Sequence, residues 1–419
     1  MLFLAASGPL TAGAAERPIV ISGAALLSPD ATGVVTGMQL LVQDGRIRQI
    51  AARITPPEGA IRIDAAGCTV LPGLIDLHTH LLLHPYDEAR WEDQVLRESL
   101  ALRTVRATAA ARQTLMAGFT TIRELGTEGA DYADVGLRDA FAARISPGPR
   151  IFAATRAIVA TGCYGPAGFD SRWQVPQGAQ EASGVEEVRK AVRRQIAGGA
   201  DWIKVYADYH RAPGGPTTAT FTLEEMQAAV NEARTAGLQV AAHATTVEGI
   251  RRCVVAGVAT VEHGYEANEE NLRSIQQANI TLCPTLAAAE AYEKYFGGWK
   301  PGEPDTPRLR QAKEMVRQAV RMEVFIGCGS DAGVFAHGDN ARELELLVEC
   351  GMTPIQAIAA ATATAARVLR RDDLGRLAEG ATADLLIVRG DPLKEIGALR
   401  RATLVIKEGR VEMQRSGPP

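Results

Sequence analysis

The stretch Leu71-Pro-Gly-Leu-Ile-Asp-Leu-His-Thr-His80 decides how the fold of this chain can be interpreted. It ends an apolar run, Thr69 to His80, that has the composition of a buried β-strand. Side chains alternate between the two faces of a strand, so His78 and His80 point to one side while Thr79 points away. Two imidazoles on one face can bind a metal ion, but this triplet alone is weak evidence.

Seven more apolar stretches follow at intervals, so we expect eight strands in all. The others are Thr120 to Leu125, Arg150 to Thr155, Trp202 to Ala207, Gln239 to Thr245, Thr260 to His263, Thr281 to Thr285 and Phe325 to Asp331. Amphipathic helical patterns such as Glu186 to Gln195 and Leu223 to Val230 lie between them. This alternation predicts parallel pairing in an α/β fold, and eight units in about 300 residues favour a TIM-like (β/α)8 barrel over a doubly wound sheet.

Both ends of the chain have the pattern of short strands. Residues 17–68 contain the hairpin signal Asp44-Gly45, and residues 374–419 contain two further apolar runs. Neither piece alone can form a stable sheet with a covered face, so we expect them to build one small β-sandwich domain together. The predicted organisation is this domain beside a barrel at 69–373.

The first 16 residues resemble the apolar end of a truncated secretory signal, with Ala12-Gly13-Ala14 as the cleavage-site pattern but without a basic start. The alternative is an apolar start to a cytoplasmic protein. The first interpretation would place the protein in the periplasm or outside the cell, and the second in the cytoplasm. No other apolar run has the length of a membrane span.

Composition excludes several classes of partner. The chain has 419 residues, with 45 Lys and Arg against 49 Asp and Glu, and its net charge of −4 offers no basic surface for nucleic acid or an anionic membrane. The six cysteines are scattered without a CxxC pair, so we expect buried thiols rather than a zinc ribbon or a disulfide scaffold. A small-molecule substrate is the remaining expectation.

Four of the seven histidines, His78, His80, His243 and His263, fall at or near the ends of expected strands, and Asp331 ends the last one. Barrel enzymes build their active sites at that end. A shared metal site explains this set better than five independent placements.

Lys204 is the least expected residue, because it is the one cation in a mainly apolar strand and an unpaired buried ammonium costs several kcal/mol. It could extend to the barrel mouth or pair with a carboxylate. The functional alternative is a neutral amine that reacts with CO2 to form a carbamate, whose two oxygens can bridge two metal ions.

The order of these motifs resembles that of the amidohydrolase superfamily. The resemblance covers nearly the whole chain and is closest to the imidazolonepropionase-like branch, which includes Xaa-Pro dipeptidases and ochratoxin-degrading amidohydrolases. It is carried by Leu71 to His80, Gly118-Phe-Thr-Thr-Ile-Arg-Glu124, Asp201-Trp-Ile-Lys204, His243, Val261-Glu-His-Gly264, Gly329-Ser-Asp331 and Asp373 to Leu385.

The resemblance implies a binuclear centre of two zinc ions, or other divalent cations, and a homo-oligomer for which an octamer is one candidate. By it, His78, His80 and Asp331 would bind one ion and His243 and His263 the other, with N6-carboxylysine at Lys204 between them. Asp331 would be the catalytic base. The implied reaction is cleavage of the amide bond of dipeptides or N-acyl amino acids, ochratoxin-type amides included.

Other activities remain open from the sequence. The same centre could hydrolyse cyclic amides, lactones or phosphotriesters, and a catalytically silent scaffold is a further alternative, against which the intact ligand set weighs strongly. Many members of the branch carry a TGGH-like segment where this chain has Thr161-Gly-Cys-Tyr-Gly165. The candidate substrate contacts are Tyr164, Tyr206, His210 and His337, and the Gly-rich loop 297–305 is either a lid or a contact between subunits.

Overall fold

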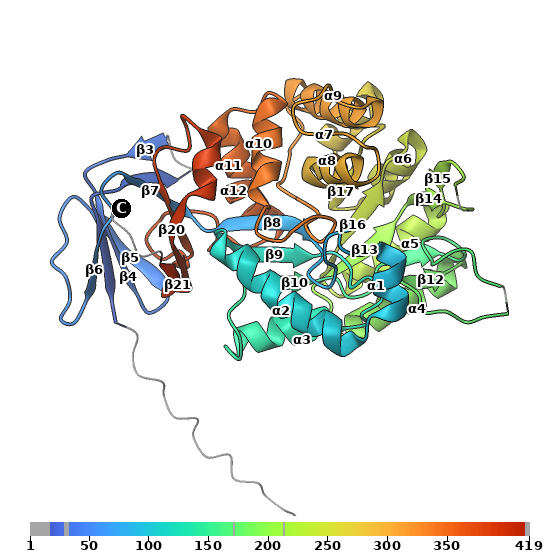
Figure 1. Cartoon of the computed structure of the whole chain (residues 1–419), viewed down its shortest axis with the longest axis horizontal. Coiled ribbons are helices and arrows are strands. Elements are labelled where there is room, and N and C mark those ends of the chain that lie inside the picture. Colours follow the sequence, from blue (N-terminus) through green and yellow to red (C-terminus); the bar gives the residue numbers. More distant parts are fainter. Residues whose placement is uncertain (1–16, 29–32, 171, 213, 415–419) are drawn as a thin grey trace, which may run out of the picture.

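A computed structural model describes residues 17–28, 33–170, 172–212 and 214–414. The signal remnant predicted at 1–16 lies outside these residues. The fold is mixed α/β, as predicted. Strands from both ends of the sequence lie at one end of the molecule, at the left of Figure 1, and the helix-rich part lies at the other. No helix in the described part combines the length and the apolar character needed to cross a membrane.

The strands from the chain ends form two sheets. One has the order β5-β4-β1-β6 and the other the order β21-β20-β19-β7-β2-β3, so the first and last parts of the sequence share a sheet. The strands are β1 (Ile19–Ser22), β2 (Ala25–Ser28), β3 (Gly33–Val35), β4 (Gln39–Gln43), β5 (Arg46–Ala51), β6 (Ile61–Asp64), β7 (Cys68–Pro72), β19 (Leu385–Arg389), β20 (Ala402–Lys407) and β21 (Arg410–Gln414).

The predicted hairpin at Asp44-Gly45 is confirmed. It joins the antiparallel pair β4 and β5, in which Gln43 faces Arg46. Both turn residues have positive φ, 51° for Asp44 and 73° for Gly45. This left-handed pair matches the twist of the flanking strands, and Asp and Gly adopt it readily.

The middle of the chain alternates strands and helices. The strands are β8 (Leu74–Thr79), β9 (Phe119–Glu124), β10 (Arg150–Ala153), β11 (Ile158–Ala160), β12 (Gln180–Ala182), β13 (Trp202–Tyr206), β14 (Asp208–His210), β15 (Thr217–Ala219), β16 (Gln239–Ala244), β17 (Thr260–His263) and β18 (Thr281–Cys283). Parallel pairing links β10-β9-β8 and β12-β11-β13-β16-β17-β18. The predicted parallel pairing is therefore confirmed for these strands.

The helices are α1 (Trp91–Arg97), α2 (Leu100–Met116), α3 (Ala133–Ala142), α4 (Gly184–Ala197), α5 (Leu223–Thr235), α6 (Val247–Ala256), α7 (Glu269–Gln277), α8 (Leu286–Tyr295), α9 (Pro307–Arg321), α10 (Ala341–Glu349), α11 (Pro354–Ala360) and α12 (Ala363–Val368), with a 3-10 turn at Ile396–Arg400. The predicted periodicity is visible in α4, which buries Val188, Ala191, Val192 and Gln195. Apolar residues three and four apart thus face the strands.

Two predicted strands differ from the structure. The run Thr69 to His80 is divided between β7, which pairs with β19 and β2, and β8, which pairs with β9. The chain passes from one sheet to the other at Gly73. The Gly73 N–H donates to Asp384 O at 2.8 Å, and a Cβ at this position would lie 2.3 Å from Thr120 Oγ1. The prediction of one continuous strand was wrong because this glycine changes sheets.

The segment predicted as the last strand, Phe325 to Asp331, makes only isolated parallel bridges. Ile326 pairs with Leu282 of β18, and Ala332 pairs with Thr79 of β8. Between them Leu77 N donates to Cys328 O at 2.8 Å. Asp331 has a φ of 61°, which breaks the extended backbone and ends the run.

All six cysteines are free and buried, as predicted. The loop 297–305 is anchored by Trp299, which is 7% exposed and packs with Ala289, Leu309 and Tyr265. A lid and a contact between subunits both remain predictions for this loop.

Gly375 lies in the segment that leads from the last α-helix to the sheet formed by both chain ends, and its packing can be tested. It has a φ of 68°, and an added Cβ would lie 2.5 Å from Thr362 O. We expect Gly375→Ala to lower the free energy of unfolding by about 3 kcal/mol or more, since backbone cannot move aside and a left-handed alanine is strained. Gly380→Ala is the matched control, with a φ of 86° and no atom within 4 Å of the added Cβ. It should cost only about 1 kcal/mol. Equal urea midpoints for the two variants would contradict this packing.

Candidate metal centre

The strand ends bring the six predicted ligand residues into one buried cluster. His78 lies on β8 and His80 just after it, Lys204 on β13, His243 on β16 and His263 at the end of β17. In the parallel register Ala244 faces His263 and Lys204 faces Ala241, so neighbouring strands present their side chains at the same edge. Asp331 reaches this edge from the segment between β18 and α10, and its N–H donates to His78 O at 2.7 Å.

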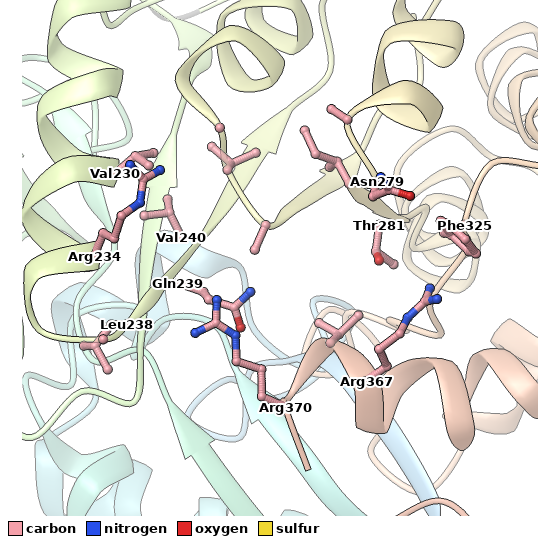
Figure 2. Close-up of a pocket in the computed structure, with 17 residues that line it drawn as sticks. Val230, Arg234, Leu238, Gln239, Val240, Asn279, Thr281, Phe325, Arg367 and Arg370 are labelled. Carbon is pink, nitrogen blue, oxygen red and sulfur yellow. The ribbon is translucent and has the colours of Figure 1, made fainter. Parts of the chain in front are cut away.

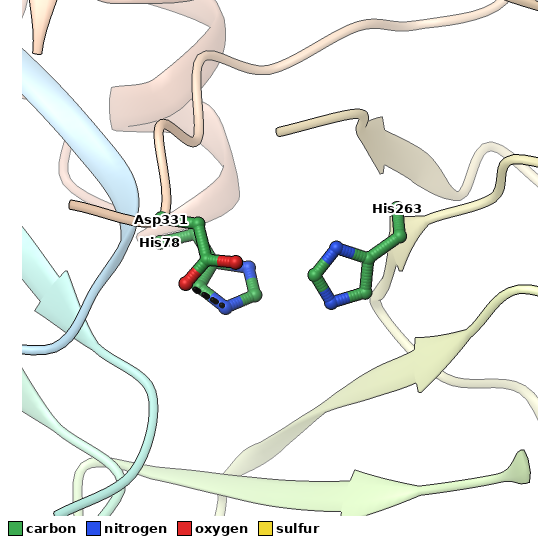
Figure 3. A group of neighbouring side chains, drawn as sticks. All are labelled: His78, His263 and Asp331. Carbon is green, nitrogen blue, oxygen red and sulfur yellow. Dashed lines mark ion pairs between the residues drawn. The ribbon is translucent and has the colours of Figure 1, made fainter. Parts of the chain in front are cut away.

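Distances within the cluster suit a shared cation. One ligand atom from each of His78, His263 and Asp331 lies within 4.8 Å of the others, and Figure 3 shows His263 facing the other two across a gap. Asp331 Oδ1 lies 3.3 Å from His80 Nε2 and 3.7 Å from His78 Nε2. The ring centres of His243 and His263 are 4.5 Å apart.

Three of the imidazoles are oriented by a contact at Nδ1. His78 Nδ1 lies 2.8 Å from Glu262 Oε2, and His80 Nδ1 lies 2.9 Å from Gly126 O. His263 Nδ1 lies 2.7 Å from Thr285 Oγ1, which also contacts Tyr265 Oη at 2.8 Å. If Nδ1 carries the proton, each Nε2 keeps its lone pair for a metal ion.

His78 also contacts a buried ion pair between Arg123 and Glu262, whose role the sequence alone does not predict. Arg123 Nη2 donates to Glu262 Oε1 at 2.9 Å, and Arg123 Nε donates to Leu77 O at 2.6 Å. Both side chains are fully buried, and the guanidinium lies 4.4 Å from the ring centre of Trp202. The sequence held one signal for this ion pair: an arginine within an apolar strand, and a glutamate directly before a histidine in a later strand.

The segment that carries Asp331 is fixed by a second buried carboxylate. Asp76 Oδ1 accepts from Ser330 N at 2.9 Å and from His78 N at 3.1 Å, while Asp76 Oδ2 accepts from Asn340 Nδ2 at 2.8 Å. Asp331 and His263 both have positive φ, 61° and 72°. Such backbone costs about 1 kcal/mol or more per residue and is kept where neighbouring contacts enforce it.

Lys204 is the clearest anomaly of the cluster. Its side chain is 1% exposed, and within the described residues Nζ has no hydrogen-bond partner. Its nearest ring contact is Tyr206, 5.4 Å from Nζ. Burial lowers the pKa of Lys204, although Glu262 and Asp331 oppose the shift. A neutral amine is the form that can react with CO2.

The histidines are likewise held in the neutral form that binds metals. Burial lowers the pKa of His78, His243 and His263 well below the usual range, and lowers that of His80 to about 4. Burial also raises the pKa of Asp331 well above its usual range, with Lys204 opposing this. A bound cation would favour the carboxylate again. Four imidazoles, a carboxylate and an unpartnered amine fit divalent ions such as zinc.

The candidate substrate contacts differ in position. Tyr206 stacks on His243 with ring centres 4.5 Å apart, and Tyr164 lies 4.5 Å from Tyr206, so both border the cluster. His210 is exposed on the hairpin β14-β15. His337 is buried, and its ring nitrogens contact Thr114 Oγ1 and His80 O, which favours a supporting position.

His84 is 8% exposed and lies between Glu88 and Glu98. A cavity of about 520 Å³ lies at the opposite ends of the strands, where Gln239 and Thr281 begin β16 and β18 (Figure 2). It is remote from the cluster by topology, because His243 and His263 lie at the other ends of their strands.

Comparison with known proteins decides the family. The amidohydrolase family model matches residues 69–411. The chain belongs to the amidohydrolase family. Among curated relatives, an ochratoxinase of Aspergillus niger is 28% identical over 434 residues, covering 93% of this chain and 87% of the relative. An imidazolonepropionase of Mycolicibacterium smegmatis is 27% identical over 367 residues, with 85% of each chain covered.

Solved structures agree with this placement. A Xaa-Pro dipeptidase with methionine bound in its active site is 32% identical and covers 94% of this amidohydrolase and 99% of its own chain, with a TM-score of 0.85. The predicted superfamily branch is therefore confirmed. Family membership supports a hydrolase that acts on amides.

The Arg123–Glu262 pair of this amidohydrolase gives a stability test on metal-free protein. Glu262→Ala should lower the free energy of unfolding by about 3–5 kcal/mol, because it leaves a buried guanidinium without its counter-charge. The matched control is Glu248→Ala, which breaks the surface pairs with Arg251 and Arg252 and should cost below about 1 kcal/mol. Urea unfolding compares the two, and a Glu262→Ala protein as stable as the control variant would refute the role given to this pair.

Proposed function

We propose that this chain is a binuclear metal-dependent amidohydrolase that cleaves the amide bond of dipeptides or N-acyl amino acids. The observation that carries the proposal is Lys204 Nζ, a buried amine without a hydrogen-bond partner in the described structure, surrounded by four neutral imidazoles and Asp331. A structural lysine would need a carboxylate or carbonyl partner at that depth. A carbamylated lysine between two cations removes the anomaly.

The fold proposed with it is a closed TIM-like (β/α)8 barrel at 69–373 and a β-sandwich domain from 17–68 and 374–419. The isolated bridges from Ile326 to β18 and from Ala332 to β8 support closure, because they link the last and first parallel strands. The buried residues Leu40 and Ile47 belong to one core cluster with Leu385 and Ile406, which supports the sandwich.

In the proposed centre, His78, His80 and Asp331 would hold one cation and His243 and His263 the second, and Lys204, as N6-carboxylysine, would supply a further ligand. When bound, two divalent cations would lower the pKa of a shared water and polarise the scissile carbonyl. Asp331 would accept a proton from the attacking water and return it to the leaving nitrogen. Asp331 Oδ1 lies 3.3 Å from His80 Nε2, which supports this role.

The substrate class rests on the relatives and on the aromatic side chains that lie beside the histidine cluster. One relative is named an ochratoxinase and one similar solved structure is a Xaa-Pro dipeptidase, a name that denotes cleavage of a dipeptide. Zinc as the resident ion, a small-molecule substrate and a homo-oligomer such as an octamer belong to the same proposal.

The function is tested with zinc-loaded protein and four substrate classes: dipeptides, N-acyl amino acids, lactones and phosphotriesters. We expect the highest kcat/KM within the first two. Asp331→Asn keeps the shape but cannot accept a proton, so kcat should fall by about a hundredfold or more, as expected for a positioned acid–base group.

The metal content of the same Asp331→Asn samples shows whether a lower kcat reflects loss of the base or loss of a metal ion. Glu248→Ala is the surface control and should keep full activity. Turnover confined to lactones or phosphotriesters would refute the amide proposal, and an Asp331→Asn effect confined to KM would refute the base assignment.

A further inference from the structure

Glu128 is a buried carboxylate that the mechanism above does not use. It follows β9 in the loop before α3, has a φ of 51° and is 1% exposed. Its Oε2 accepts from Tyr164 Oη at 2.5 Å and from Trp91 Nε1 at 2.8 Å. Its Oε1 is buried as well, and no donor in the described part of the chain reaches it. One oxygen is thus satisfied by neutral donors and the other is open.

The unpartnered oxygen lies beside the metal centre. Glu128 Oε1 is 3.7 Å from His80 Nδ1, whose hydrogen bond goes instead to Gly126 O at 2.9 Å. A group bound at the cluster would therefore have this carboxylate as a neighbour.

No cation of the described chain neutralises Glu128 directly. Arg103 and Lys204 attract Glu128 only without direct contact. The hydrogen bonds of Arg103 go to the carbonyl oxygens of Leu82, Thr127 and Glu128 itself. Arg123 is engaged by Glu262. A buried carboxylate without a paired cation costs several kcal/mol, so a cationic ligand at this position would gain correspondingly.

Aromatic side chains lie next to the Glu128 carboxylate. Tyr164 lies with its ring centre 4.9 Å from Trp91 and 5.0 Å from Tyr209, and all three side chains are half-buried. Tyr206 continues the cluster to His243. Ring faces next to a carboxylate are the usual surroundings of a bound organic ammonium, because both attract positive charge.

We propose that Glu128, with the neighbouring aromatic side chains of Trp91, Tyr164 and Tyr209, binds a positively charged amino group of the substrate close to the scissile amide. This inference rests on the proposed function and deepens it: amides with a free amino group on the acyl side, such as dipeptides, are preferred over their N-acylated counterparts. Glu128 is then a specificity-determining residue.

The test compares dipeptides with their N-acetyl derivatives, matched for the leaving amino acid, on zinc-loaded protein. We expect kcat/KM to be about tenfold or more higher for the free amine, the range of a charge-assisted contact. Glu128→Gln should lower kcat/KM for the dipeptide about tenfold while changing that for the N-acetyl derivative less than about threefold. The control Glu92→Gln removes the same charge from an exposed position beside Trp91 and should leave the preference intact.

Three results would overturn the inference while leaving amide hydrolysis standing. These are equal or better turnover of N-acetyl substrates by the wild type, equal losses on both substrates in Glu128→Gln, and loss of metal from that variant. If no amide is cleaved at all, the proposed function fails separately. Ligand-observed NMR with n-butylammonium and n-butanol then still decides: selective binding of the ammonium that is lost in Glu128→Gln supports the site, and no selectivity refutes it.

Discussion

The burial of one amine without a partner is the constraint on which the rest of this site depends. Lys204 lies on a strand whose other side chains are buried, and Nζ finds no acceptor in the described structure. Burial drives the amine and the surrounding imidazoles towards their neutral forms. Neutral imidazoles bind cations, and a neutral amine can be converted to an anionic ligand by CO2. The same desolvation that would destabilise a structural lysine therefore favours the proposed metal centre.

Three of the four imidazoles are oriented by chemically different partners. His78 is oriented by a carboxylate that is itself paired with Arg123, His80 by a carbonyl, and His263 by a hydroxyl. A carboxylate partner makes an imidazole a stronger ligand than a neutral partner does. The two proposed cations would therefore differ in the basicity of their ligands, with the more basic set on the side of His78.

Much of this arrangement could be predicted from local patterns. His78 and His80 are two residues apart on one strand, so strand geometry places their side chains on the same face. Isolated polar residues in the other apolar runs predict the remaining members of the cluster. The change of sheet at Gly73 could not be predicted, since it depends on the close approach of Thr120 from a distant strand. Similarly, Glu128 meets Trp91 and Tyr164 only through loop packing, and no spacing in the sequence signals a contact between residues so far apart.

The central claim, that Lys204 is the carbamylated bridge of a binuclear centre, is tested most directly by carbon-13 NMR of zinc-loaded protein prepared in labelled bicarbonate. A carbamate resonance should appear in the wild type together with about two zinc ions per chain, and Lys204→Ala should lose the resonance and most of the metal. Lys313→Ala is the matched control, because Lys313 is a buried lysine whose Nζ is already paired with Asp305 at 3.0 Å, and it should keep both. A fully zinc-loaded wild type without the resonance, or a Lys204→Ala protein that retains two ions, would contradict the account.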